Sequence, residues 1–236
     1  MRARVPFPCA VLSVEVIPER TRFLGCSPRY IDDSVGSEAM EAVVKLARQY
    51  WFEKNQPQRK NFIARHLSFH GNTVATLSLA HNAARRAPYE AILDHDNFFH
   101  VSPAYYKRFA KQGESEEAYV QRLAKELEDK ILELGPQTVA GFVAETVVGA
   151  TTGAVPAPSG YFKAVREVCD KYDVLFILDE VMSGMGRRSP PTHYASLDEQ
   201  LMLVVWKAWV PCTRGRASET THLRISKLLQ KVSEGG

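Results

Sequence analysis

The strongest constraint on the fold lies in residues 139–179, where two short apolar runs flank a helical pattern. The first run, Val139–Ala144, ends in Glu145. The second run, Val174–Leu178, is the most strand-like segment of the chain and ends in Asp179. Between them lie a loop rich in Gly, Pro and Thr and a helical pattern that starts at Ser159. Strand, loop, helix and strand in this order predict a βαβ unit with a parallel sheet.

Three further elements precede this unit. Ser37 can cap a helix whose apolar residues recur at helical spacing, and Asn61–Arg65 is a short strand candidate. Glu116–Leu134 carries apolar residues on one face and charges on the other, which predicts an amphipathic helix that Gly135 and Pro136 end. We therefore expect an α/β fold, with a mostly parallel sheet flanked by helices.

The chain divides into three regions of different character. Residues 1–34 are irregular and rich in Arg and Pro, and residues 188–236 are irregular again. Residues 35–187 alternate helical patterns with short apolar runs, which is the periodicity of a packed core. We expect this middle region to form the folded domain.

The composition argues against a nucleic-acid-binding protein and against a membrane protein. The net charge of +3 is too small, and the basic residues are too scattered, to predict a nucleic-acid surface. The cysteines form no CxxC pair, which favours a reducing compartment, and Cys169 falls in a helical pattern typical of a buried, unreactive thiol. No run approaches the roughly 18 apolar residues of a membrane helix. We therefore expect a cytoplasmic protein with no nucleic-acid and no membrane partner.

Asp179 has the clearest chemical meaning of any single residue. It ends a run apolar enough for burial on both faces, and ligands of open α/β sheets bind beyond the carboxyl ends of the strands. A buried carboxylate needs a partner, such as a metal ion, a protonated ring nitrogen or a helix amino terminus. A capped turn is the simpler alternative. A Walker B acid is disfavoured, because the chain has no glycine-rich phosphate loop ending in Lys-Ser or Lys-Thr.

Two other segments are candidates for a ligand site. Gly36 and Ser37 stand at a predicted helix start, where free N–H groups and the serine hydroxyl can hold a phosphate, although an ordinary helix start has the same residues. Phe69 precedes a His-Gly pair and can present a ring face to a planar cofactor. His66 and His70 are four residues apart, but their run predicts a strand and a loop, so no metal site is expected.

Together these segments resemble one family, the class III pyridoxal-phosphate-dependent aminotransferases. The family's phosphate-binding segment is similar to GSEAMEAVVKLARQY, and its aromatic-His-Gly motif is similar to SFHGNT. Its central signature is similar to VAGFVAETVVGATTGAVPAPSGYFKAVREVCDKYDVLFILDEVMSGMGR. The resemblance implies that residues 35–187 form part of the large domain of a fold type I pyridoxal-phosphate-dependent transferase. The family's amino-terminal substrate-binding segment and carboxy-terminal small domain have no counterpart, so we expect a chain truncated at both ends.

The resemblance implies that the cofactor is pyridoxal 5′-phosphate. It assigns the phosphate to Gly36 and Ser37. It also implies that Phe69 stacks on the pyridine ring, with His70 beside it.

Three more residues are implied to contact the cofactor. Glu145 matches the family's acidic residue near the cofactor and the substrate. Asp179 would bind the pyridinium nitrogen and keep it protonated, so that the ring accepts electrons. Val181 would pack on the opposite face of the ring.

The match ends after Arg187. The family continues with Thr-Gly, but Arg188 and Ser189 follow here, and the family lysine has no clean counterpart. The first lysine after Asp179 is Lys207, which precedes Ala-Trp-Val in place of the family's Gly-Leu-Gly. Codons for Gly-Leu-Gly read one base out of step can give Ala-Trp-Val, so our hypothesis is a frameshifted or mis-spliced tail. The catalytic residue is therefore unknown, and packing between two tryptophans is favoured for Lys207 over a displaced catalytic role.

Two functions remain open at this point. The resemblance implies an aminotransferase, with an amine or amino acid as amino donor, a 2-oxo acid as acceptor, and a homodimer as the assembly. The alternative is a catalytically inactive truncated protein or a partner-binding fragment, because the lysine that holds the cofactor and moves the proton is not identifiable. The residues present do not specify the amino donor.

Overall fold

A parallel sheet forms the centre of the molecule. The computed structural model describes residues 10–11, 36–183, 202–205 and 208–209. Five strands lie in the order β3-β2-β4-β7-β8, and each neighbouring pair is parallel. They are β2 (Asn61–Arg65), β3 (Phe98–Val101), β4 (Val139–Glu145), β7 (Leu175–Asp179) and β8 (Met202–Val205). The expected α/β fold with a parallel sheet is confirmed.

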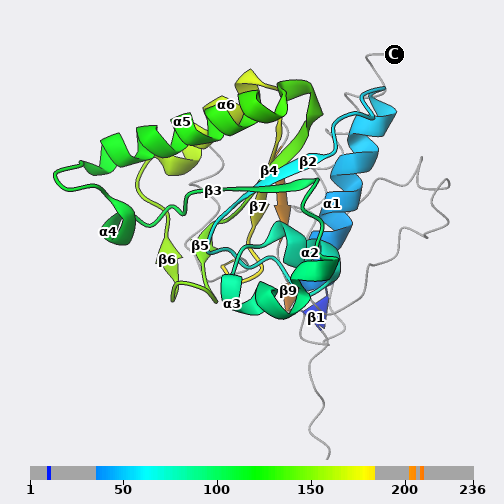
Figure 1. Ribbon diagram of the computed structural model, residues 1–236, viewed down its shortest axis with the longest axis horizontal. Coiled ribbons are helices and arrows are strands. Elements are labelled where there is room, and N and C mark those ends of the chain that lie inside the picture. Colours follow the sequence, from blue (N-terminus) through cyan, green and yellow to red (C-terminus); the bar gives the residue numbers. More distant parts are fainter. Residues whose placement is uncertain (1–9, 12–35, 184–201, 206–207, 210–236) are drawn as a thin grey trace, which may run out of the picture.

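Helices cover both faces of this sheet (Figure 1). One face packs against α1 (Gly36–Glu53), and the other packs against α5 (Glu116–Leu134) and α6 (Tyr161–Lys171). The shorter helical segments are α2 (Val74–Leu79), α3 (Ala83–Arg86), η2 (Ala87–Ile92), α4 (Tyr106–Phe109) and η3 (Pro136–Thr138). Two short antiparallel pairs complete the described fold: β5 (Val147–Val148) with β6 (Val155–Pro156), and β1 (Ala10–Val11) with β9 (Ala208–Trp209).

The central strands are apolar because they are buried on both faces. Every residue of β4 and of β7 is buried. Phe142 and Phe176 are paired across these strands, and their rings stack with centroids 6.3 Å apart. On the α1 side, Trp51 is fully buried and donates its indole N–H to the Ala140 carbonyl at 2.8 Å. Two helical layers therefore fix the sheet and hold the carboxyl ends of its strands in place.

The sequence predicted the long elements with small errors. The predicted bounds of β2 and α5 are those observed. Helix α6 begins two residues after Ser159, because Gly160 adopts a left-handed conformation (φ 77°) ahead of it. Strand β3 was not predicted, and β8 lies in the carboxy-terminal region that was expected to be irregular. β8 pairs with the buried strand β7, and this long-range partner leaves no local periodic signal.

Ser115 caps α5 and provides a local test of the fold. Its side chain accepts a hydrogen bond from the Ala118 N–H at 3.2 Å. We expect Ser115→Ala to lower the free energy of unfolding by about 1 kcal/mol, because one N–H of the first turn loses its acceptor. Urea denaturation followed by circular dichroism measures this change, and a cost below about 0.3 kcal/mol would show that the cap is not needed.

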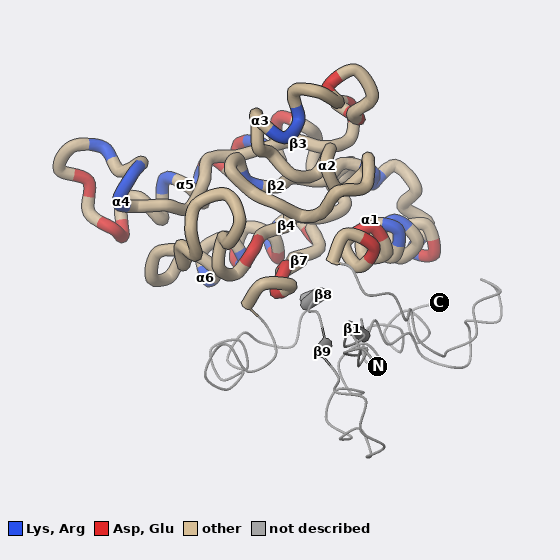
Figure 2. The backbone as a smooth tube through the Cα atoms, turned by 90° about the horizontal axis from the view of Figure 1, so that it is seen from below, with Lys and Arg blue, Asp and Glu red and all other residues tan. Residues whose placement is uncertain are grey.

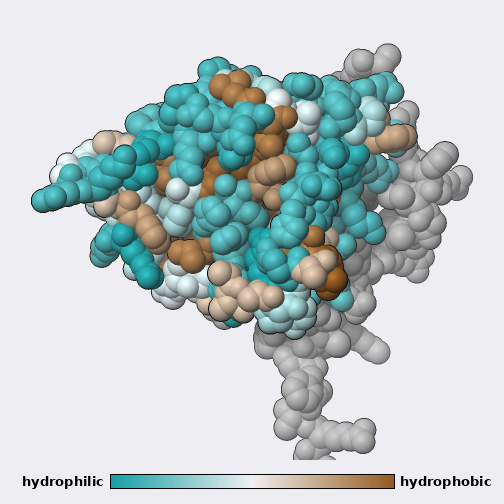
Figure 3. Space-filling view, in the orientation of Figure 1, coloured by the Kyte–Doolittle hydropathy of each residue, from teal (hydrophilic) through white to brown (hydrophobic). Residues whose placement is uncertain are grey.

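The surface is mixed in charge and polarity. Lys and Arg alternate with Asp and Glu along the described chain (Figure 2). The face over α5 and α6 is mainly hydrophilic, with apolar patches between the polar side chains (Figure 3). Among the described helices, none has both the length and the apolar character to cross a bilayer.

Candidate functional site

Two carboxylates meet at the carboxyl edge of the sheet. Glu145 ends β4, Asp179 ends β7, and the two residues are register partners in the parallel ladder. They are only 3% and 6% exposed. Two acids this close and this buried need hydrogen-bond donors to offset the cost of desolvation.

Asp179 obtains two donors. Its Oδ2 accepts a hydrogen bond from His70 Nδ1 at 2.9 Å, and its Oδ1 accepts one from the Val181 N–H at 3.0 Å. The acid is therefore partnered, and the partner that the sequence left open is the imidazole of His70. A carboxylate has about four acceptor sites, so each Asp179 oxygen can accept one more hydrogen bond.

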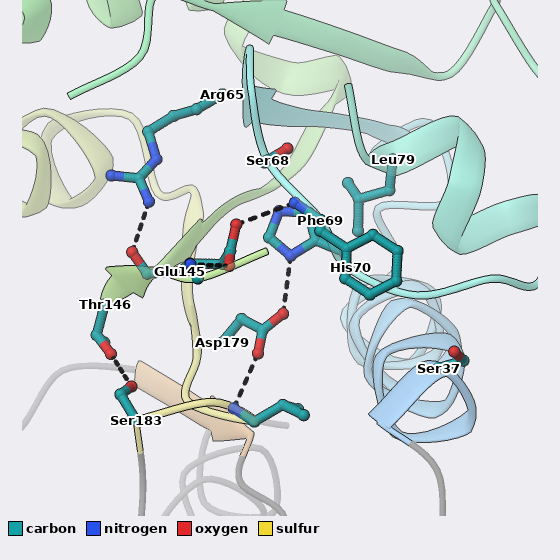
Figure 4. A network of polar contacts seen from close by, with 12 residues as sticks. Ser37, Arg65, Ser68, Phe69, His70, Leu79, Glu145, Thr146, Asp179 and Ser183 are labelled. Carbon is teal, nitrogen blue, oxygen red and sulfur yellow. Dashed lines mark hydrogen bonds and ion pairs between the residues drawn. The ribbon is translucent and has the colours of Figure 1, made fainter. Parts of the chain in front are cut away.

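His70 lies at the meeting point of the two acids (Figure 4). It is 2% exposed, and its Nε2 has no hydrogen-bond partner. Burial raises the pKa of Glu145, and the neighbouring His70 offsets part of that rise. His70 thus provides Asp179 with a hydrogen-bond donor from a side chain that is itself buried.

Backbone N–H groups hold the Glu145 side chain. Its Oε1 accepts from the Phe69 N–H at 2.9 Å, and its Oε2 accepts from the Gly149 N–H at 3.2 Å. The loop that carries Phe69 and His70 is therefore fastened to β4 through one carboxylate and to β7 through another. Figure 4 shows the Phe69 ring directed away from these contacts, toward the side where Ser37 lies.

The start of α1 packs against the same loop. Ser37 Oγ accepts a hydrogen bond from the Asn72 N–H at 2.9 Å. Gly71 (φ 138°) and Gly36 permit this close approach. A Cβ on Gly71 would lie 2.7 Å from Ser37 Cα, and one on Gly36 would lie 2.6 Å from Val181 Cγ1. The helix start is thereby brought beside the His70 loop and the residue that follows β7.

The predicted site residues are thus linked by direct contacts. Ser37 reaches the Phe69–Asn72 loop, Phe69 reaches Glu145, and His70 reaches Asp179. Whether each one contacts a cofactor stays a prediction. Lys207 lies outside the described residues. Cys169 is fully buried, and burial raises the pKa of its thiol, as expected for an unreactive cysteine.

Three features of this edge were not predicted. Arg65 is 1% exposed, donates to the Glu145 carbonyl at 2.5 Å, and has no hydrogen-bond partner at Nε or Nη1. The Arg85 guanidinium lies 4.6 Å from the centre of the Phe69 ring. The hydroxyl groups of Thr146 and Ser183 form a hydrogen bond at this edge of the sheet. These contacts connect segments that are separated in the sequence, so no local sequence pattern predicts them.

The residues present fit pyridoxal 5′-phosphate. The free N–H groups at the start of α1 and the Ser37 hydroxyl, whose proton is not used by Asn72, suit a phosphate. Phe69 provides an aromatic face, and Asp179 has acceptor capacity left for a ring N–H. Across the described chain, no group of three or more His, Cys, Asp or Glu side chains is arranged to hold a metal ion.

The parallel α/β fold with an acid at the strand end matches part of the fold of omega transaminases. The structure is similar to that of the omega transaminase of Pseudomonas jessenii in complex with PMP, with a TM-score of 0.66 and 38% identity. That similarity covers 73% of this chain and 38% of the transaminase chain. A thermostable variant of the omega transaminase from the same organism gives a TM-score of 0.61 at 42% identity, over 64% of this chain and 33% of that chain.

The chain belongs to the class-III aminotransferase family. The family description "Aminotransferase class-III" matches residues 21–190. An aminotransferase of Gibberella zeae is 56% identical over 154 residues, which are 64% of this chain and 30% of that protein. An uncharacterized aminotransferase of Schizosaccharomyces pombe is 54% identical over 152 residues, or 64% of this chain and 33% of that protein. The chain therefore spans about a third of the length of the curated relatives that it matches.

Proposed function

We propose that this chain binds pyridoxal 5′-phosphate non-covalently at the carboxyl edge of its sheet. The observation that carries the proposal is the buried Asp179 carboxylate, which is fixed by His70 and Val181 and still has acceptor capacity on both oxygens. When bound, the cofactor supplies a ring that withdraws electrons from a substrate carbon.

The chain's own residues would each perform one task. Asp179 would hold the proton on the ring nitrogen, and His70 would orient the acid by donating a hydrogen bond to it. Ser37 and the first N–H groups of α1 bind the phosphate, and Phe69 packs on one face of the ring. Gly36 leaves room for Val181 beside this helix start. Glu145 positions the Phe69 backbone at the mouth of the site.

For the longer family members, the function that this site supports is transfer of an amino group from an amine or amino acid to a 2-oxo acid. For this chain, we propose cofactor binding without efficient transfer. The reason is that the sequence after Asp179 has no clean counterpart of the family lysine, which anchors the cofactor covalently and moves the proton.

We also propose that the chain forms a homodimer. Val74, Tyr89 and Ile92 on α2 and η2 are 51%, 49% and 61% exposed, which leaves apolar side chains available for a second copy. Light scattering after size exclusion would distinguish a dimer from a monomer.

Cofactor binding is tested with pyridoxamine 5′-phosphate, which has no aldehyde and so does not label surface lysines. We expect saturable binding by isothermal titration, and no binding would overturn the proposal.

A second experiment uses pyridoxal 5′-phosphate with borohydride reduction and peptide mapping. We expect no stoichiometric label, whereas full label on Lys207 would show that this lysine forms the covalent link to the cofactor and would contradict non-covalent binding.

A further inference from the structure

Three imidazoles from segments on either side of the Phe69 loop in the sequence pack against one another. The ring centroids of His66 and His81 are 4.2 Å apart, those of His81 and His100 are 4.9 Å apart, and those of His66 and His100 are 5.6 Å apart. Each residue comes from a different segment. His66 follows β2, His100 lies in β3, and His81 lies between α2 and α3.

The cluster fastens the loop that carries two predicted cofactor contacts. The His81 N–H donates to Ser68 Oγ at 3.3 Å, and these residues form an isolated β-bridge. His100 Nε2 donates to the Leu79 carbonyl at 2.9 Å, and the His66 N–H donates to the Val101 carbonyl at 2.7 Å. Phe69 directly follows Ser68, so the His81 contact lies one residue from the ring that is predicted to stack on the cofactor.

The close packing of the three rings favours neutral imidazoles. Because His100 Nε2 already carries the proton that it donates to the Leu79 carbonyl, an additional proton would go to Nδ1. His81 Nδ1 is buried and has no hydrogen-bond partner, so a second ring proton there would gain no acceptor. Two or three cations within 6 Å would also repel one another.

The charged neighbours do not offset this repulsion. Arg86 of α3 is buried and lowers the pKa of all three histidines. Two acids face the cluster: Glu126 of α5 already accepts from the Ser102 N–H, and Glu90 of η2 pairs with Arg86 and His95. Burial is the largest cause of each shift, and it lowers the pKa of His100 to about 3.

We propose that His66, His81 and His100 form a proton-sensitive clasp that holds the Ser68–His70 segment in its binding position and releases it in acid. An open hollow of about 450 Å³ beside His81, which Arg86 and Glu90 also line, gives protons a route to the cluster. The release of the loop follows from the cluster alone. Its effect on cofactor affinity rests on the proposed function.

The direction of the effect follows from proton linkage. In the closed loop the histidines resist protonation, whereas in the open loop each has its ordinary pKa near 6.5. Closure is therefore fully favoured above pH 6.5 and is lost progressively below it. His100 alone is expected to raise the opening equilibrium by roughly 20-fold between pH 7 and pH 5.

Hydrogen exchange by mass spectrometry tests the clasp on the whole chain. After correction for intrinsic exchange rates, we expect residues 66–82 to lose protection by at least about 20-fold from pH 7 to pH 5, with less change in α6 as internal reference. Unchanged protection of residues 66–82, or an equal loss in α6, would overturn the proposal.

Two substitutions separate the cluster from general acid effects. His100→Gln keeps a donor for the Leu79 carbonyl but cannot titrate. In this variant the protection of residues 66–82 from hydrogen exchange should therefore depend much less on pH. His95→Gln is the matched control, because His95 is 53% exposed and contacts Glu90 outside the cluster. Retained wild-type pH dependence in His100→Gln, or its loss in His95→Gln, would contradict the clasp.

Pyridoxamine phosphate titrations at the same pH values separate the clasp from the proposed function. We expect affinity to fall in acid for the wild type more than for His100→Gln. Loop opening without any binding at pH 7 would retain the clasp and discard the cofactor site. Binding with the same pH dependence in both proteins would discard the link between them.

Discussion

Asp179→Asn is expected to weaken pyridoxamine phosphate binding by about 2–3 kcal/mol, or roughly 30- to 150-fold. The carboxylate is 6% exposed and offers a buried negative charge to a ring N–H. The amide keeps the shape of the side chain but removes the charge, so the bond to a protonated ring nitrogen loses its ionic component. Isothermal titration of both proteins measures the change.

The Asp179 prediction needs a control for the loss of one negative charge. Asp129→Asn provides it, because Asp129 is 59% exposed and pairs with Lys125 on the solvent face of α5. Its affinity for pyridoxamine phosphate should equal that of the wild type. Near-UV circular dichroism checks that Asp179→Asn is still folded, since His70 loses its charged partner. A folded Asp179→Asn protein with unchanged affinity would place the ring nitrogen elsewhere.

The buried strands explain why much of the fold was predictable. β4 and β7 are apolar up to their terminal acids because helices cover both faces of the parallel sheet. A continuous apolar run of this kind can be recognised directly in the sequence. β3 is less distinct, since three of its four residues are only half-buried. The sequence around β8 has no steady period, and the pairing of β8 with β7 depends on a contact that no local pattern encodes.

The site was predictable in its parts but not in its connections. The apolar run before Asp179 showed that the acid is buried and needs a partner. It did not show that His70, which is 109 residues earlier, supplies the hydrogen bond. The guanidinium of Arg85 over Phe69 and the contact of three histidines also depend on packing between distant segments. A single sequence predicts buried segments and helix starts better than it predicts contacts between side chains that are distant in the chain.

Gly71→Ala is expected to lower the free energy of unfolding by about 3 kcal/mol or more. Gly71 has φ 138°, a conformation that L side chains rarely adopt. The new methyl group would lie 2.6 Å from Thr76 Oγ1 and 2.7 Å from Ser37 Cα. Ser37 Cα belongs to the backbone of α1, and the Thr76 hydroxyl is held by Thr73, so neither can move without breaking other contacts.

The same substitution tests how the two halves of the proposed site are joined. If the helix start of α1 must touch the loop to place Ser37 beside Phe69, Gly71→Ala should abolish pyridoxamine phosphate binding even where the protein stays folded. Gly113→Ala is the matched control: Gly113 has φ 76° but nothing within 4 Å of a new Cβ, so only backbone strain of about 1–2 kcal/mol applies. Urea denaturation gives both stabilities, and titration gives both affinities. If Gly71→Ala and Gly113→Ala lower the free energy of unfolding equally, the backbone of α1 can shift to accommodate the new methyl group. Normal binding by Gly71→Ala would show that the phosphate is held without the close approach of Ser37 to this loop.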